Sequence, residues 1–277
     1  MPMSPRLLRP RATGTVVVAT DADARAYVLA VNAADGQPLE PAVQLAINAF
    51  VVGCKADGIW SAIRASCILC GARTLSGALT PLAGTAPTNN GPFVSGDYNR
   101  RTGLVGDGTA KYLDSGRSNA ADPQNSQHLA VYVTTAATSN ASQFPLFIGA
   151  GGGNVGATHF GRLNNNGVLF FRNRNQAVDS ATAGTGSATG LIGAARSSAS
   201  SYTTRISGTD ATVTRTSESP LARPLFVFAS SDPFSGVAAG TFANARLAFY
   251  SIGESLSLSA LDSRVTTLYN AIGAAIP

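Results

Sequence analysis

Hydrophobic residues near the start of the chain recur at helical spacing. Tyr27, Val28 and Val31 fall on one face of a segment that follows Asp21, a favourable N-cap residue. The pair at 35–36, Asp-Gly, should end that helix. The pattern therefore predicts an amphipathic helix here, followed by further helical segments up to residue 79.

Two more helices are expected in this region. Pro41 suits a first helical turn, and Val43 and Ile47 continue at an interval of four residues, so a second helix should run to residue 53 or 54. A third, short helix is expected from residue 57 to about 66, with Trp60 directed into the core.

Past residue 80 the pattern changes to short β-like runs between clusters of Gly, Asn, Ser and Pro. Pro145 predicts that the run at 144–148 lies at a sheet edge, and the residues at 164–167 are a strong hairpin signal. Roughly nine closely spaced strands are typical of an antiparallel sandwich. The other strands are expected at 129–135, 168–173, 190–195, 202–207, 211–216, 225–229 and 245–252.

The chain closes with a predicted helix that Ser259 caps. One apolar stripe continues along it to the end, formed by Leu261, Val265, Leu268 and Ile272. Together the patterns predict a mostly β protein: an antiparallel sandwich with a small N-terminal helical domain and a C-terminal helix. We divide the chain into an arm at 1–20, the helical domain at 21–80, and the sandwich with its helix at 81–277.

Composition adds a view of the surface. Charged residues make up 13% of the 277 residues, where about 25% is usual, and the formal net charge is +5. Small neutral residues must therefore cover much of the surface, which suits packed assemblies. The chain shows no convincing signal peptide and no apolar run of about 18 residues. We expect a protein made in the cytoplasm, with no membrane partner.

Basic residues gather at the N-terminus, where no acidic residue precedes Asp21. This arm is open to three interpretations: a solvated tail, a nonspecific contact with nucleic acid, or a segment that docks on a neighbouring subunit. Leu7 and Leu8 would gain nothing from contact with phosphate groups. We therefore favour docking and no nucleic-acid partner, and the docking residues would be Arg6, Leu7, Leu8, Arg9 and Arg11.

Three cysteines, Cys54, Cys67 and Cys70, form an odd and clustered set, unlike the framework of a secreted disulfide protein. Cys67 and Cys70 have the spacing of half a zinc knuckle, but only His128 and His159 are available as further ligands, and both are distant in sequence. We predict buried free thiols and no bound metal.

Two other ligand-binding patterns are incomplete. Asp107, Asp114 and Asp122 lie in loops beside predicted strands, yet no contiguous calcium-binding loop is present, so solvated turn residues are the default interpretation. The glycine run at 151–156 matches G-x-G-x-x-G, but a strand and a hairpin follow it rather than a helix. We predict no cofactor.

The positions of the acidic residues and histidines do not match the usual hydrolase sites. The three glutamates, Glu40, Glu218 and Glu254, fall in separate elements, so no close carboxylate pair for glycoside hydrolysis is expected. His128 and His159 do not accompany a Gly-x-Ser-x-Gly elbow, and we interpret them as ordinary strand residues. The chain is predicted not to be an enzyme.

Several segments resemble structural proteins of tailed bacteriophages, cyanophages included. Residues 99–113 and 245–256 look like the opening and closing strands of a laminin-G or concanavalin-like jelly roll, and the segments at 6–11, 50–60, 88–98 and 111–114 are similar to virion proteins of such phages. The resemblance implies a virion component with a lectin-like sandwich, and it brings no catalytic residues.

Two functions follow from this resemblance. In the first, the protein is a tail or fibre appendage, an adhesin whose loops bind host surface glycan with Arg174, Tyr202 and Phe234. In the second, it is a capsid decoration protein that cements the head shell. We favour the appendage. In either case we expect a virion location, other virion proteins as partners, and a homo-oligomer, with a trimer as our guess.

Overall fold

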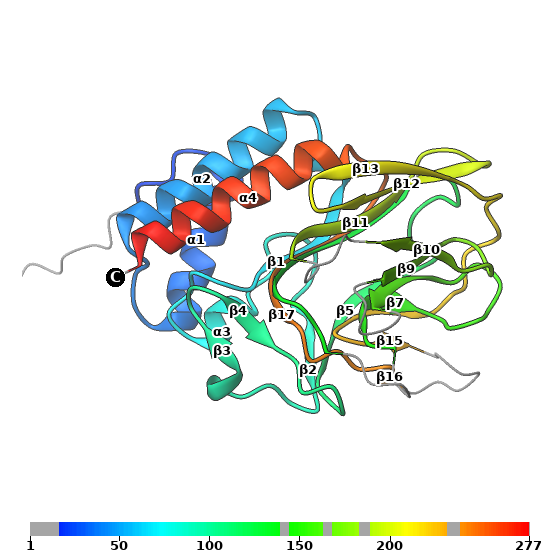
Figure 1. Cartoon of the computed structure of the whole chain (residues 1–277). Helices are drawn as coiled ribbons and strands as arrows, with labels where there is room; N and C mark the ends of the chain where they lie inside the picture. The colour runs from blue at the N-terminus through cyan, green and yellow to red at the C-terminus, as the bar shows by residue number, and fades with distance from the viewer. Residues whose placement is uncertain (1–16, 139–143, 163–167, 183–188, 232–238, 277) are drawn as a thin grey trace, which may run out of the picture.

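The computed structural model describes residues 17–138, 144–162, 168–182, 189–231 and 239–276. Two β-sheets lie face to face, and a layer of helices covers the outer side of one of them (Figure 1). Strand pairs are antiparallel apart from a single parallel contact between Ser231 and Ala150 in the second sheet. The predicted fold class is confirmed: a mostly β jelly-roll sandwich with N-terminal helices and a C-terminal helix.

The sheet under the helices, sheet A, has the strand order β13-β12-β11-β6-β17-β4-β3, and β1 also pairs with β17. The bounds of its strands are β1 Ile63–Ile68, β3 Tyr98–Asn99, β4 Gly103–Val105, β6 Gln127–Thr135, β11 Gly190–Arg196, β12 Ser201–Ile206, β13 Thr209–Thr214 and β17 Arg246–Gly253.

The second sheet, sheet B, has the order β10-β9-β8-β7-β14-β5-β2, with β15 and β16 joined at β7. The bounds of its strands are β2 Thr88–Asn90, β5 Tyr112–Ser118, β7 Leu146–Ala150, β8 Thr158–Arg162, β9 Val168–Asn173, β10 Asp179–Thr182, β14 Pro224–Val227, β15 Ser230–Ser231 and β16 Ala239–Gly240.

Helices from both ends of the chain form one layer on sheet A. Asp21 caps α1 by accepting hydrogen bonds from two backbone N–H groups, and Ser257 caps α4 by accepting one. The cap of the final helix is therefore Ser257, two residues before the predicted Ser259. The bounds are α1 Ala22–Asp35, α2 Pro41–Ala56, α3 Leu75–Ala78 and α4 Leu258–Ala275, with short 3-10 turns at η1 Trp60–Ala62 and η2 Ser95–Asp97.

Two hydrophobic cores result from this layering. One lies between the helices and sheet A and includes Phe50, Phe249 and the predicted stripe of α4, from Leu261 to Ile272. The other fills the space between the two sheets and includes Phe147 and Phe160. Because the N-terminal helices share their core with the C-terminal helix, the two ends of the chain stabilise each other. The division of the chain at residue 80 stays a prediction.

The opening and closing strands pair as the resemblance implied. In β17, Arg246 and Leu247 pair with Val105 and Leu104 of β4. The other flank of β17 lies along β6, from Arg246 to Gly253. The closing strand is therefore interior to sheet A.

The third predicted helix is wrong. Residues 57–66 form the 3-10 turn η1 and then enter β1, which pairs with β17 from Ile63 to Ile68. Gly58, at φ +70°, ends the run that α2 began. Apart from Arg64, the strand after it is buried on both faces, and helical spacing alone does not show whether such a run is a buried helix or a buried strand.

The predicted edge position of the run at 144–148 is also wrong. Strand β7 begins at Leu146, one residue after Pro145, and lies between β8 and β14. The missing N–H of Pro145 therefore costs no ladder hydrogen bond. The hairpin predicted at 164–167 lies outside the described residues, and the strands on either side of it, β8 and β9, pair antiparallel.

Candidate functional site

The outer face of sheet B carries a group of side chains that the core does not use. Along β8 and β9, Phe160 and Phe171 pair and face the inter-sheet core. Successive strand residues alternate between faces, so His159, Phe170 and Arg172 point the other way. Gly149 on the neighbouring strand leaves room for the His159 side chain, because a Cβ on Gly149 would lie 2.1 Å from the Cβ of His159.

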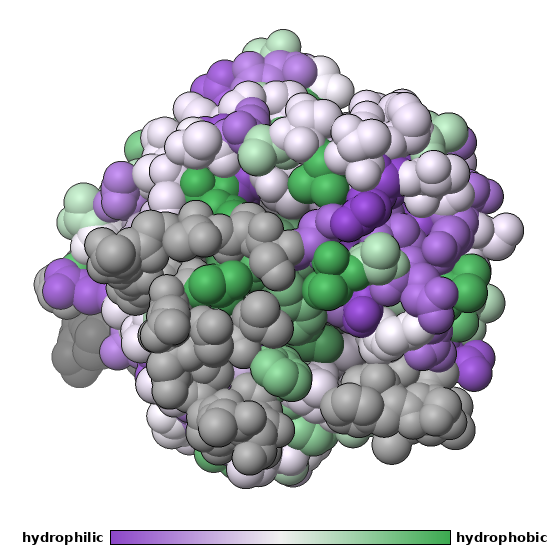
Figure 2. All heavy atoms as spheres, turned by 45° about the vertical axis from the view of Figure 1, so that its right-hand side comes forward, coloured by the Kyte–Doolittle hydropathy of each residue, from purple (hydrophilic) through white to green (hydrophobic). Residues whose placement is uncertain are grey.

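These side chains line a hollow of about 240 Å³. Figure 2 turns this side of the molecule forward and shows hydrophobic side chains gathered in the middle of the face beside hydrophilic ones. The ring of Phe170 meets both Phe144 and His159 edge to face, with centroids 6.4 and 5.6 Å away. The hollow is lined by Phe144, Leu146, Gly152, Gly153, His159, Phe170, Arg172 and Thr241.

His159 is held neutral and in one tautomer. Burial first, and the charge of Arg172 second, lower the pKa of His159 to about 3. Its Nδ1 lies 2.8 Å from the carbonyl oxygen of Gly151, which can only accept, so Nδ1 carries the proton. The Nε2 lone pair is then free to accept the 3.3 Å contact from Arg172 Nη1.

Arg172 brings a positive charge to the hollow that no described carboxylate neutralises. Its guanidinium donates to the carbonyl oxygens of Gln176 and Gly152 and to His159, all of them uncharged acceptors. Partial burial lowers its pKa, but it stays protonated at neutral pH. The arrangement suits an anionic group that arrives from solvent, since such a group would complete the pairing.

The loop residues expected to bind glycan do not form a site. Arg174 is fully buried and donates to Gln127 Oε1 and to the carbonyl oxygens of Asp122 and Pro123. Tyr202 is 2% exposed, belongs to the inter-sheet core and donates to Asp179. Both calls are wrong because sequence alone did not reveal burial. Phe234 and the arm residues Arg6, Leu7, Leu8, Arg9 and Arg11 lie outside the described residues.

The glutamates are far apart and engaged. Glu40 binds Arg100 and Arg73, Glu254 binds Arg64, and Glu218 accepts from the backbone N–H of Gly156. Gly156, the last residue of the glycine motif, lies in a loop between β7 and β8. Its N–H is thus already used within the fold.

The three aspartates considered for a cation are occupied within the fold. Asp107 accepts three backbone N–H groups. Burial alone would raise its pKa, but these hydrogen bonds outweigh that effect and lower it to about 2. Asp114 accepts from Gly116, and Asp122 is buried against Arg117. Within the described ranges, no three His, Cys, Asp or Glu side chains are grouped to hold a metal ion.

The cysteine pair is split between the two cores. Cys67 lies between the sheets, with its Sγ 3.3 Å from the hydroxyl of Tyr250, and Cys70 lies under the helices. Burial raises the pKa of each of these thiols, and that of Cys54, to about 12. The two sulfurs face different sides of sheet A and do not form a ligand pair.

Sequence reasoning missed His159, Phe170 and Arg172 as a group. The available signal was the alternation in Thr158-His-Phe-Gly and in Val168-Leu-Phe-Phe-Arg-Asn, which places a polar or aromatic residue on the second face of each strand. It was weak because Phe170 and Phe171 are identical in type, so nothing in the sequence marks which one faces the core.

The comparisons with known proteins come from solved structures alone, since no protein-family model and no curated protein sequence matches the chain. Similar structures include the CBM40 domain of a Ruminococcus gnavus sialidase bound to α2,3 sialyllactose (13% identity over 52% of this chain, TM-score 0.37). They also include mouse laminin α1 domains LG4-5, with 13% identity over 61% of this chain and a TM-score of 0.37. A third is the binding domain of botulinum neurotoxin serotype D, with 11% identity over 74% of this chain and a TM-score of 0.47.

This chain spans 83% of the sialidase domain but only 47% and 51% of the laminin and neurotoxin chains. The similar structures are carbohydrate-binding or laminin-G-like domains. The likenesses are weak, and the fold assignment rests on the strand order and pairing described above. In the described part of the chain, no helix combines the length and hydrophobicity needed to cross a bilayer.

Proposed function

We propose that the protein is a non-enzymatic binding module that takes an acidic glycan into the hollow on the outer face of sheet B. The observation that carries the proposal is Arg172: a partly buried guanidinium at an aromatic hollow, without a carboxylate partner among the described residues. A sialic or uronic acid supplies the missing carboxylate together with hydroxyl groups and an apolar ring face.

The other lining residues fit such a ligand. Phe144 and Phe170 offer apolar surface for the C–H face of a sugar ring. His159 is neutral, so it adds no second positive charge, and its contact with Arg172 orients the guanidinium. Among the described residues that line the hollow there is no carboxylate that could serve as the general acid of glycoside cleavage. Binding without turnover is the function this geometry supports.

The wider role is part of the same proposal. On the resemblance to tailed-phage structural proteins, we place the module on the virion as a tail or fibre appendage that contacts host surface glycan, docked by its N-terminal arm. Capsid decoration is the second candidate, on the same resemblance. Labelled antibodies against the protein, viewed on particles by electron microscopy, separate a tail position from a head position.

A glycan array with the purified full chain tests the binding function. Sialylated and uronate-containing glycans are printed beside the same glycans with the acidic group removed or reduced. Saturable binding to the acidic member of each pair, and not to its neutral counterpart, supports the proposal. Equal binding to both members, cleavage of any printed glycan, or no binding on a folded sample contradicts it.

Assembly into a homo-oligomer is proposed as well, and helix α2 supports it. Its outward face is apolar along its whole length, and it is formed by Ala42, Leu45, Ala49, Val52 and Ala56. The intervals between these residues are three, four, three and four, the spacing of a helix–helix seam. Leu45 and Val52 are 53% and 44% exposed. In an antiparallel pairing with a second copy, each bulky residue faces an alanine, so the seam complements itself.

A further inference from the structure

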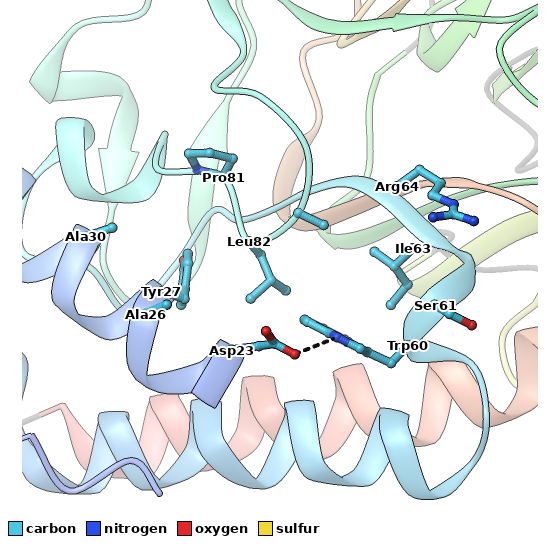
Figure 3. Close-up of a pocket in the computed structure, with 11 residues that line it drawn as sticks. Asp23, Ala26, Tyr27, Ala30, Trp60, Ser61, Ile63, Arg64, Pro81 and Leu82 are labelled. Carbon is cyan, nitrogen blue, oxygen red and sulfur yellow. Dashed lines mark hydrogen bonds between the residues drawn. The ribbon is translucent and has the colours of Figure 1, made fainter. Parts of the chain in front are cut away.

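A second hollow, of about 480 Å³, lies on the helical side of the molecule (Figure 3). Helix α1 forms one wall with Ala26 and Ala30, and Trp60 and Ile63 of η1 and β1 form the opposite wall. Residues 81–83 close a third side. It shares no lining residue with the hollow on sheet B, so the two are separate sites.

Trp60 is fixed at the edge of this hollow. Its Nε1–H donates to Oδ2 of Asp23 at 3.1 Å, and Lys55 pairs with the same carboxylate at 2.7 Å. The Lys55 ammonium also lies 5.9 Å from the centre of the indole ring. Trp60 packs against the helical core, as the sequence predicted, and because it is only half-buried it also lines the hollow. An indole held in one orientation is a rigid platform that loses little freedom on binding.

Both cations around Trp60 are paired with carboxylates. Lys55 is shared between Asp23 and Asp21, and Arg64, on the other side of the indole, is paired with Glu254. The side chains of Asp23 and Arg64 are about half exposed, which leaves further hydrogen-bonding positions open to a ligand. Because both cations are already paired, this site offers an acidic ligand no free positive charge, so it favours a neutral ligand rich in hydroxyl groups.

Tyr27 adds a second aromatic side chain to the lining, and it is only 6% exposed. The lining thus combines a fixed indole ring, apolar walls and three polar side chains, those of Asp23, Arg64 and Ser61.

We infer that this hollow is a binding site for a neutral pyranose unit, with the C–H face of the sugar on Trp60 and its hydroxyl groups on Asp23 and Arg64. A chain with two sugar sites on separate faces holds a branched or repeating glycan at two points, which strengthens attachment through effective concentration. The inference adds a second site to the proposed function, and it stands or falls on its own test.

The protein provides its own probe for this site, because Trp60 is the single tryptophan of the chain. Neutral methyl glycosides of glucose, galactose, mannose and N-acetylglucosamine are titrated into the full chain while its intrinsic fluorescence is recorded. A sugar on the indole excludes water, so we expect a saturable blue shift for at least one of them. No saturable change for any of the four, on a folded sample, overturns the inference.

Variants separate the two sites. Arg64→Met leaves the indole and its bond to Asp23 intact and removes a hydroxyl partner, so the fluorescence titration should weaken about tenfold. Arg172→Met should leave that titration unchanged while it weakens binding of acidic glycans by ~10-fold to 100-fold. A fluorescence response lost in Arg172→Met and kept in Arg64→Met would assign the sugar to sheet B and overturn the second site. Loss of acidic-glycan binding alone leaves it standing.

Discussion

Nη1 of Arg172 lies 3.3 Å from Nε2 of His159 on the outer face of sheet B, a contact between a cation and a neutral imidazole. The lone pair of Nε2 orients the guanidinium without cancelling its charge, because burial keeps the proton off this nitrogen. The described residues of the hollow therefore carry a net positive charge, on a guanidinium whose orientation is fixed.

Replacing Arg172 by Met should weaken binding of an acidic glycan by ~10-fold to 100-fold, since a charge-assisted hydrogen bond contributes about 1.5–3 kcal/mol. Isothermal titration calorimetry with a sialylated or uronate oligosaccharide measures the loss. Arg25→Met is the matched control: it removes the same charge from an exposed position on α1. If both variants weaken binding equally, the attraction is nonspecific and the site is wrong.

Acid should destabilise the protein through its two buried histidines. Burial is the main cause that lowers the pKa of His128 to about 4 and that of His159 to about 3, whereas an unfolded histidine titrates near 6.5. As the pH falls below about 6.5, the unfolded state gains protons that the folded state does not, so stability falls. The linkage slope is about 1.4 kcal/mol per pH unit for each histidine.

Urea unfolding at pH 7, 6 and 5 measures this slope. His128→Asn should flatten it by about half, because asparagine retains a donor toward the carbonyl oxygen of Glu254 but takes up no proton. The comparison needs only the slopes, so a lower overall stability of the variant does not disturb it. A slope unchanged by His128→Asn would show that His128 is protonated in the folded protein.

The pattern of apolar residues predicted the positions of most helices and strands but not which strands pair or which polar side chains are buried. The stripe from Leu261 to Ile272 is buried as predicted, because a 3.6-residue period identifies one face of a helix directly. A helix is predicted at 57–66 from the helical spacing of its apolar residues, whereas the strand conformation of β1 depends on pairing with β17, which lies about 180 residues away in sequence.

The sequence also did not predict which charged side chains are buried. Arg172 and Arg174 are two residues apart, yet one lines the hollow and the other is fully buried. Nothing local in the sequence distinguishes them, since the difference comes from the end of β9 and the loops that cover Arg174. The group formed by His159 and Arg172 likewise arises from strand register.

Buried Arg196 should prove essential to the stability of the sandwich. Its guanidinium donates to the carbonyl oxygens of Asn173, Ser198, Ser201 and Arg215 and lies 5.2 Å from the ring of Tyr202. It thus ties the end of sheet B to three segments of sheet A.

Arg196→Met should reduce the free energy of unfolding by about 2–4 kcal/mol, because it leaves the buried carbonyl of Asn173 and three part-buried carbonyls without this donor. Arg196→Lys should cost less, since lysine keeps three donors. Urea unfolding curves of both variants test the order. A methionine variant as stable as the wild type would mean that these carbonyls are satisfied by water.

The three cysteines should not react with thiol reagents in the native protein. Each thiol is buried, and burial raises the pKa of each to about 12, so the reactive thiolate is scarce at pH 8. We expect no reaction with Ellman's reagent over minutes in buffer and three equivalents released in denaturant. One equivalent released rapidly from the native state would contradict the described burial of that thiol.

The outward face of α2 predicts the assembly state. If the seam of Leu45 and Val52 holds copies together, Leu45→Glu combined with Val52→Glu places carboxylates in an apolar contact and should reduce the particle to a single chain of 28.2 kDa. Multi-angle light scattering after size-exclusion chromatography gives the mass. Leu29→Glu, an equally exposed leucine on α1 outside the seam, should keep the assembled mass. A wild-type chain that elutes at 28.2 kDa at all concentrations would rule out the seam as a contact, since an apolar stripe that pairs copies must raise the mass before any charge is introduced.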